Sequence, residues 1–231
     1  GKSYEKIAAA GGGIRNSVRR FREASTEDIR QITRRRITRF FEYGTTTIEA
    51  KSGYGLSLED EIRTLEIIAD LNKEQDLQMV PTFLGAHEIP DEFQENREGY
   101  IDLLIREMIP VVAGRKLARF CDVFCEKGVF TVEESRRILN AAKEHGLVPK
   151  LHADELHASG GAELAAELRA VSADHLVRVS DRGIREMASM RVIPVLLPGT
   201  TFFLGKDEYA PARKFIEAGC QLAVSTDFNP G

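Results

Sequence analysis

Helix-forming segments alternate with short apolar runs along most of this 231-residue sequence, and this alternation limits the possible folds more than any other feature. Three helices are expected to begin after Ser25, Ser57 and Thr131, because an acidic residue follows each of them three positions later. Further helices are expected near residues 100–112, 161–168, 181–190 and 209–218. The β-prone runs are residues 45–49, 79–84, 119–125, 148–152, 171–175, 192–197 and 222–226.

Strands that alternate with helices indicate a parallel sheet covered by helices, because parallel neighbours require a long crossover connection. The runs give seven strands, whereas a closed (β/α)8 barrel has eight strands and about 250 residues. An open doubly wound sheet is the alternative, but the glycines at 11–13 follow a helical stretch and lack the spacing of a phosphate-binding turn. We therefore expect an α/β fold of the (β/α)8 TIM-barrel type, with the first strand absent from this chain. Residues 1–231 would form one partial barrel domain containing strands 2–8.

Pro81, Pro149 and Pro194 fall inside three of the expected strands. A proline removes one hydrogen-bond donor from a strand ladder, so it is unusual there. Either the strand boundaries are misplaced at these residues or the strands bulge locally. The count of seven strands depends on accepting these three runs.

The composition is that of an ordinary globular protein, with 42 % apolar and 29 % charged residues, which excludes a disordered chain. The net charge of −4 gives no electrostatic footprint for nucleic acid. No run approaches the 18 or so apolar residues of a membrane span and no signal peptide is recognisable, so we expect no membrane partner. The odd number of cysteines (Cys121, Cys125 and Cys220) favours a reducing compartment such as the cytoplasm.

Polar side chains follow nearly every expected strand, at the end where the active sites of such barrels lie. Three of the five histidines in the chain occupy such positions. The polar residues of these strand ends make up a predicted rim: Lys51, Tyr54, His87, Glu126, His152, Asp154, Glu155, His175, Asp227 and Asn229. This rim is the candidate active site.

Imidazole and carboxylate groups from separate strand ends are ligands that zinc or iron(II) accept. Glu155 lies three residues beyond His152 and could move protons without being a ligand. Asp227 could ligate the metal or act as a base. Taken singly, these signals have ordinary structural explanations, because an isolated strand-end histidine is more often a hydrogen-bonded rim residue and residues 227–231 fit a turn. The residues alone thus predict a barrel with a polar mouth that could bind a metal, but no particular substrate.

Six motifs in a fixed order carry a resemblance to a known family. They occupy residues 51–56, 83–87, 152–155, 172–176, 197–202 and 226–231, and read KSGYGL, FLGAH, HADE, SADHL, LPGTTF and TDFNPG. The chain closely resembles the imidazolonepropionase family of the amidohydrolase superfamily over essentially its whole length. The resemblance implies a metal-dependent cytosolic hydrolase of histidine breakdown. Such an enzyme opens the ring of 4-imidazolone-5-propanoate with water and forms N-formimidoyl-L-glutamate.

The resemblance also implies roles for single residues. His152 and Asp227 would be ligands of one divalent metal ion, zinc or iron. Glu155 would contact the substrate ring and take part in proton transfer, and His175 would help to polarise the attacked carbonyl. The residues expected to hold the small-molecule substrate are Tyr54, His87, Glu155, Asn229, the backbone at Gly231 and, with less support, Tyr4. The family resemblance further suggests a homodimer.

The sequence departs from the family pattern at the metal site. The family carries a His-x-His pair and then an arginine on its first barrel strand, but here no His-x-His occurs and the first histidine is His87. The family also continues beyond the last motif and has a small β-rich domain. We therefore expect this chain to be an internal segment of a longer enzyme. Two alternatives stay open: a sibling amidohydrolase, such as a deaminase or another cyclic amidase, and a non-catalytic barrel that binds a ring.

Overall fold

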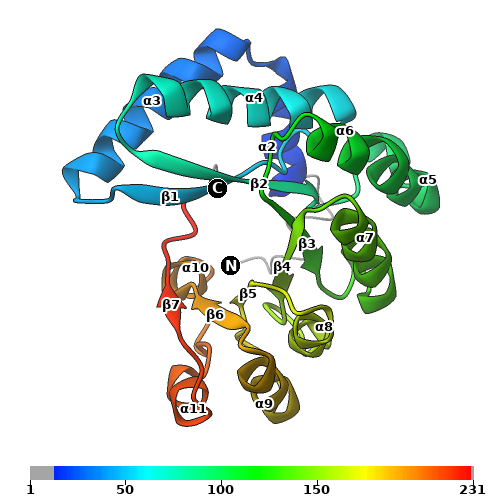
Figure 1. The fold of residues 1–231 in the computed structure, drawn as a ribbon, viewed down its shortest axis with the longest axis vertical. Helices are drawn as coiled ribbons and strands as arrows, with labels where there is room; N and C mark the ends of the chain where they lie inside the picture. Colours follow the sequence, from blue (N-terminus) through cyan, green and yellow to red (C-terminus); the bar gives the residue numbers. More distant parts are fainter. Residues whose placement is uncertain (1–12, 230–231) are drawn as a thin grey trace. The chain divides into compact units, whose positions relative to one another are not determined.

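The computed structural model describes residues 13–229 of the chain. Contacts divide these residues into two compact units, with the boundary between Phe120 and Cys121. Helices and strands alternate in both units, and strands pair in parallel within each of them (Figure 1). The expected α/β fold class is therefore confirmed, whereas a single barrel domain over residues 1–231 stays a prediction.

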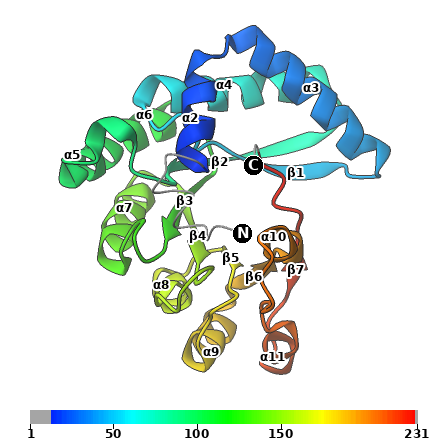
Figure 2. The same cartoon turned by 180° about the vertical axis from the view of Figure 1, so that it is seen from behind.

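The first unit builds a parallel strand pair covered by helices. Strands β1 and β2 pair from Thr47 with Gln78 to Lys51 with Thr82. Helix α4 contacts β2, and α3 contacts α4; Figures 1 and 2 show both helices on the same side of the two strands. The elements are α2 (Ile14–Glu23), α3 (Thr26–Glu42), β1 (Thr47–Lys51), α4 (Leu58–Glu74), β2 (Gln78–Ala86), the 3-10 turn η1 (Asp91–Phe93), α5 (Arg97–Leu103), the π-helical turn η2 (Leu104–Met108) and α6 (Ile109–Gly114).

The second unit repeats the strand–helix alternation. Strands β3 to β7 are neighbours in their sequence order. Helices α7, α8 and α9 lie along one side of these strands in both views (Figures 1 and 2). The elements are β3 (Phe120–Cys125), α7 (Val132–Glu144), β4 (Val148–Ala153), α8 (Gly161–Leu168), β5 (Ser172–His175), α9 (Asp181–Met190), β6 (Ile193–Leu196), α10 (Pro198–Phe203), α11 (Ala212–Glu217) and β7 (Ala223–Val224).

The three helix starts expected from capping residues are confirmed. The hydroxyls of Ser25, Ser57 and Thr131 each accept the backbone N–H three positions later, over 3.1, 3.1 and 3.2 Å. Each bond satisfies one N–H that has no partner within the helix. Two strands differ in length from those expected: β2 extends to Ala86, and β7 contains only two residues. The short helix α10 was not expected. None of the helices described within residues 13–229 is long and apolar enough to cross a membrane.

The three prolines lie inside strands β2, β4 and β6, so misplaced boundaries are not the explanation. The carbonyl of Pro81 accepts from the N–H of Arg119, and the carbonyl of Pro149 accepts from Val171, both over 3.0 Å. Pro194 pairs with Ala173 in the register of β5 and β6. A proline lacks only the donor, so each strand keeps an acceptor at that position.

Candidate functional site

A buried cluster of one imidazole and two carboxylates lies on neighbouring strands of the second unit. His152 comes from β4, Asp122 from β3 and Asp174 from β5. Nδ1 of His152 lies 3.0 Å from Oδ1 of Asp122, and His152 stands beside Asp174 in the register of β4 and β5. Each of the three residues offers one possible ligand atom, and these three atoms lie within 4.8 Å of one another.

This donor set fits a divalent metal ion. Imidazole and carboxylate groups are ligands that zinc and iron(II) accept. Asp122 on Nδ1 would fix the tautomer and the orientation of the His152 ring, as partners behind metal-bound histidines commonly do. With Asp122 on Nδ1, a metal would bind His152 through Nε2.

Neither Asp122 nor Asp174 is among the site residues predicted from the sequence. A signal for Asp122 exists, because it is a charged residue in the middle of the apolar run FCDVFC and is fully buried. Asp174 lies within one of the six motifs, directly before His175. The partner of Asp122, His152, is on another strand, and Asp174 joins the cluster only through the register of β4 and β5, so sequence spacing alone could not identify either residue.

Glu155 and His175 face each other next to this cluster. Oε2 of Glu155 lies 3.6 Å from Nε2 of His175, and the rings of His175 and His152 have centroids 5.3 Å apart. Burial lowers the pKa of His175, while the Glu155 carboxylate acts in the opposite direction. The neutral imidazole can therefore offer one N–H donor and one acceptor at this place.

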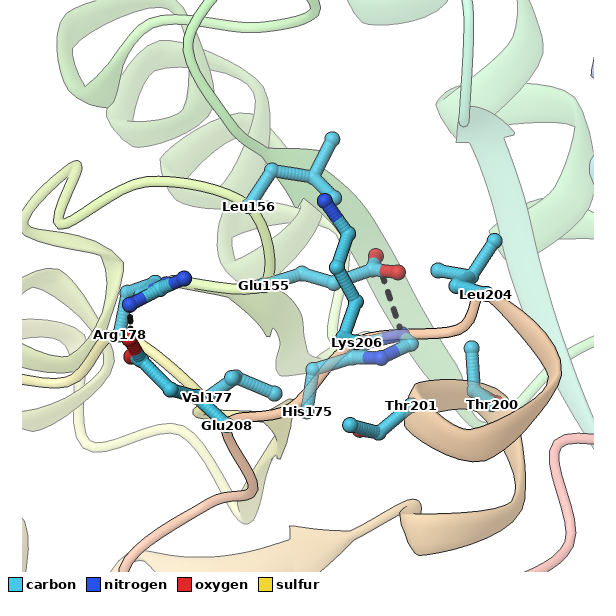
Figure 3. A pocket seen from close by; sticks show the side chains of 10 residues that line it. All are labelled: Glu155, Leu156, His175, Val177, Arg178, Thr200, Thr201, Leu204, Lys206 and Glu208. Atoms are coloured by element: carbon cyan, nitrogen blue, oxygen red, sulfur yellow. Dashed lines mark hydrogen bonds and ion pairs between the residues drawn. The ribbon is translucent and has the colours of Figure 1, made fainter. Parts of the chain in front are cut away.

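Glu155 and His175 also line a pocket (Figure 3). Thr200 and Thr201 from α10 lie on the side of the His175 ring, and the Lys206 side chain extends across the pocket past Glu155. Arg178 forms an ion pair with Glu208 at the edge. The lining therefore combines hydroxyl groups, charged groups and an imidazole, which suits a polar ligand.

Asp227 belongs to the same part of the second unit. Its Oδ2 accepts a hydrogen bond from Thr200, which lines the pocket, over 2.7 Å. The charge of Asp227 also opposes the lowering of the His175 pKa by burial. Asn229 is exposed and donates from Nδ2 to the Asp227 carbonyl over 2.9 Å. The structure thus brings Asp227 close to Thr200 and near His175, but not into the cluster of His152 with Asp122 and Asp174.

Several site residues adopt left-handed backbone. The φ angle is 50° at Asp154, 73° at His175, 59° at Leu176 and 51° at Asp227. Such conformations cost of the order of 1 kcal/mol each for residues other than glycine and are concentrated at functional sites. Their position at the carboxyl ends of β4 and β5 and after β7 supports the choice of these strand ends as the candidate site.

Tyr54 and His87 contact each other in the first unit. Their rings have centroids 5.2 Å apart in an edge-to-face arrangement, and Nδ1 of His87 lies 2.9 Å from the Gly53 carbonyl. Both residues follow strands, β1 and β2 respectively. The remaining expected substrate residues, Tyr4 and Gly231, lie outside the described residues.

A buried carboxylate from α4 fixes the loop that carries Tyr54. Glu61 accepts from the backbone N–H groups of Gly53, Gly55 and Leu56 over 2.9 to 3.1 Å. Burial raises the pKa of Glu61, and the hydrogen bonds that it accepts oppose that shift. The sequence analysis also missed this residue, because its partners are recognisable only once the loop folds back onto the helix.

Comparison with curated proteins gives relatives along the whole chain. Imidazolonepropionase from Brevibacillus brevis is 53 % identical over 231 residues, that from Geobacillus thermodenitrificans 54 % identical over 231 residues, and that from Bacteroides fragilis 52 % identical over 233 residues. Each alignment covers 100 % of this chain and 54 to 56 % of the relative. The chain is a homologue of imidazolonepropionase. It spans about half the length of the curated relatives that it matches. No protein-family model matches the sequence.

Solved structures of other enzymes share the fold of this imidazolonepropionase homologue. Guanine deaminase from C. acetobutylicum superposes with a TM-score of 0.68 at 15 % identity, covering 92 % of this chain and 52 % of that one. Adenine deaminase from Arthrobacter aurescens gives 0.67 at 18 % identity, covering 88 % and 63 %. Atrazine chlorohydrolase from Arthrobacter aurescens TC1, solved with zinc and atraton, gives 0.68 at 14 % identity, covering 97 % and 54 %. These likenesses confirm the expected barrel fold of the amidohydrolase kind.

Proposed function

We propose that the full-length protein containing this chain hydrolyses 4-imidazolone-5-propanoate to N-formimidoyl-L-glutamate. The observation that carries this proposal is the identity of 52 to 54 % to imidazolonepropionases along the entire chain. The pairing of Glu155 with His175 beside a candidate metal site supports it, because hydrolysis of a ring amide needs both an activated water and proton transfer. β1 to β7 would then be strands 2–8 of the barrel.

One divalent metal ion, zinc or iron, belongs to the proposal. His152 and Asp227 are the proposed ligands, and Asp122 would orient His152 through its Nδ1 contact. The zinc in the structure of atrazine chlorohydrolase supports a metal in this fold. A bound metal would supply Lewis-acid polarisation and a water of lowered pKa.

Proton transfer and polarisation of the carbonyl would be carried out by Glu155 and His175. Oε2 of Glu155 would accept a proton from the attacking water and return it to the ring nitrogen that leaves. His175, kept neutral by its burial, would donate an N–H to the carbonyl oxygen as negative charge develops there. The left-handed backbone at His175 directs the side chain from the end of β5 into the pocket with Glu155.

Substrate binding would use groups with both donors and acceptors. The substrate ring carries both kinds of group and its propanoate is anionic, so tyrosine, histidine and asparagine suit it better than an apolar lining. Tyr54, His87 and Asn229 are the proposed contacts, together with Glu155 for the ring. Tyr4 and the Gly231 backbone remain proposals based on the sequence.

The test follows the ultraviolet absorbance of 4-imidazolone-5-propanoate with full-length protein loaded with zinc or iron. Metal-dependent loss of absorbance is expected, and His152→Ala and Asp227→Ala should each abolish it. Asn72→Ala is the matched control, since Asn72 bonds the backbone of Met79 at the amino-terminal end of β2, away from the strand ends of the site. No absorbance loss from folded, metal-loaded protein would reject this substrate.

A deaminase is the second candidate. The likeness to adenine and guanine deaminases is the observation that favours it, although at 15 to 18 % identity it concerns the fold. Ammonia release from adenine or guanine, with no change in the imidazolone absorbance, would support this reading. A folded protein that binds the imidazolone but turns nothing over would favour the non-catalytic barrel.

The remaining parts of the proposal concern assembly and location. We propose a homodimer in the cytoplasm with a small molecule as its substrate and neither nucleic acid nor a membrane as partner. Light scattering of the full-length protein tests the assembly, and a mass of one subunit would contradict it.

A further inference from the structure

The carboxylate of Glu126 makes contacts that the proposed reaction does not use. It lies at the carboxyl end of β3 and is 1 % exposed. Oε2 of Glu126 accepts from the backbone N–H of Leu156 over 2.8 Å, with that of His157 farther away at 3.4 Å. Oε1 accepts from the Ser159 hydroxyl over 2.9 Å and contacts Nδ1 of His157 at 3.1 Å. Oε1 also accepts from the N–H of the adjacent Lys127 over 2.8 Å, whereas the other partners all belong to the segment that follows β4.

A second carboxylate, that of Asp154, belongs to this segment and accepts from its backbone. Oδ1 of Asp154 accepts from the N–H groups of Ser159, Gly160 and Gly161, and Oδ2 accepts from that of Ala162, over 2.8 to 3.2 Å. The Asp154 carbonyl accepts from the N–H of Arg178 over 2.7 Å. The segment 154–162 is therefore tied to the start of α8, to the connection after β5 and, through Glu126, to the end of β3.

Glu155 lies between these two fixed points. Asp154 before it is held by its own carboxylate and carbonyl, and Leu156 after it is held by Glu126. The Glu155 side chain is thus presented to Nε2 of His175 from a backbone restrained on both sides. Glu126 is not among the residues that line the pocket, whereas Leu156, whose N–H it accepts, is one of them.

We propose that Glu126 is a positioning residue for Glu155: its buried carboxylate holds Leu156 and Ser159 so that the Glu155 carboxylate stays aimed at His175. This inference rests on the proposed function for its effect on turnover, but its effect on the segment 154–162 is independent of the reaction. Both carboxylate oxygens are needed, because one takes the Leu156 N–H while the other takes the Ser159 hydroxyl.

The first arm of the test is a double-mutant cycle on full-length, metal-loaded protein. Glu126→Ala should lower kcat by about 10- to 100-fold, the size expected when a proton-transfer group is displaced by roughly 1 Å. In a Glu155→Gln background the same change should cost no more than about twofold, because the group that Glu126 positions is already gone. Glu126→Gln keeps the shape and one acceptor, so it should fold and retain an intermediate kcat. Equal fold-losses in both backgrounds would overturn the inference.

The second arm needs no turnover, so it separates failure of this inference from failure of the proposed function. Amide hydrogen exchange should accelerate at Leu156 and at Ser159 to Ala162 in Glu126→Ala, because Leu156 loses its acceptor and the other N–H groups lose the order of their segment, and it should accelerate less in Glu126→Gln, which keeps one acceptor. Asn72→Ala should leave exchange in this segment unchanged. Unaltered protection of these amides in both Glu126 variants would overturn the positioning role, whatever the substrate.

Discussion

At the scale of the residue, Glu61, Glu126 and Asp154 share one arrangement. Each is a buried carboxylate that accepts backbone N–H groups from a segment just beyond a strand end. A loop of this kind exposes backbone donors that a strand or helix would otherwise satisfy, and a buried donor without an acceptor costs about 1–3 kcal/mol. The three carboxylates therefore stabilise the loops that carry Tyr54 and Glu155.

Glu61→Gln tests this for the loop after β1. In glutamine one of the two carboxylate oxygens becomes an amide nitrogen that cannot accept, so the Gly53 N–H, which now contacts both oxygens, meets a donor, and we expect a loss of about 1–3 kcal/mol in the free energy of unfolding. Urea denaturation followed by circular dichroism measures it. Glu66→Gln on the same helix is the matched control, because its ion pair with Arg115 is half exposed and should contribute under about 0.5 kcal/mol. Equal losses in the two variants would contradict the role assigned to Glu61.

The three cysteines should differ in reactivity. Cys121 and Cys125 are buried, and burial raises the pKa of Cys125 to about 11, whereas Cys220 is partly exposed. Only thiolate reacts with iodoacetamide, so in the native protein Cys220 should be alkylated first and the other two only after unfolding. Peptide mapping by mass spectrometry gives the order, and Cys220→Ser is the control. Rapid alkylation of Cys125 in the folded protein would show that β3 opens easily.

At the scale of the element, local signals were sufficient for the capped helix starts but insufficient for the limits of the strands. The hydroxyl at Ser57 and the apolar spacing of Ile62, Leu65 and Ile68 lie within one helix, and all three apolar residues are buried in α4. The extension of β2 to Ala86 and the shortness of β7 depend on which backbone groups a neighbouring strand offers. Such pairing joins residues far apart in sequence, so the periodicity of one segment cannot set its limits.

The contact between α2 and η1 should depend on pH. Burial alone would raise the pKa of Asp91, but its hydrogen bonds and ion pairs with Arg15 and Arg19 hold it below the ordinary value of 3.8. A lowered folded pKa means that the pairing stabilises the folded state above pH 3.8 and that this stability is lost as the pH falls through the folded pKa. Asp91→Asn should therefore lower Tm at neutral pH and leave it nearly unchanged well below pH 3.8.

Thermal melts by circular dichroism at both pH values test this difference. Asp76→Asn, which removes an exposed carboxylate of the same unit, is the control for the substitution itself. High salt should shrink the effect of Asp91→Asn, because the pair is partly exposed. An effect that grows on acidification would contradict the assigned sign.

At the scale of the whole molecule, the sequence located the candidate site but only part of its chemistry. The rim positions of His152, Glu155, His175 and Asp227 follow from their places after strands, and all four lie in one unit beside one pocket or cluster. The role of Asp122 became clear only through its contact with His152, 30 residues away. Sequence position is enough to predict which residues lie at the carboxyl ends of the strands. A contact between side chains of two neighbouring strands can be predicted only when the register of the sheet is known.

The affinity for metal should depend on the contact between Asp122 on β3 and His152 on β4. Asp122→Asn keeps the size of the side chain but removes the charge behind His152, so we expect metal affinity to fall about 10- to 100-fold. Competition with a chromogenic chelator measures this directly on the full-length protein. Metal should also raise Tm, since a ligand at 100 times its Kd stabilises by about 2.7 kcal/mol, and the chelated protein should lose that increase. Unchanged affinity in Asp122→Asn would assign the Nδ1 contact a purely structural role.

The loop after β1 also bears on how such enzymes could be re-engineered. Its acceptor, Glu61, and the N–H groups of Gly53, Gly55 and Leu56 fall within nine consecutive residues. A graft of residues 52–61 from a relative should therefore carry the acceptor of these N–H groups with it, while His87 and Arg22, which bond the loop carbonyls, must be kept in the recipient. Grafting only residues 52–56 onto a foreign helix would leave those amides without their acceptor. By contrast, the segment after β4 depends in part on Glu126, so its exchange would require a matched change on β3 as well.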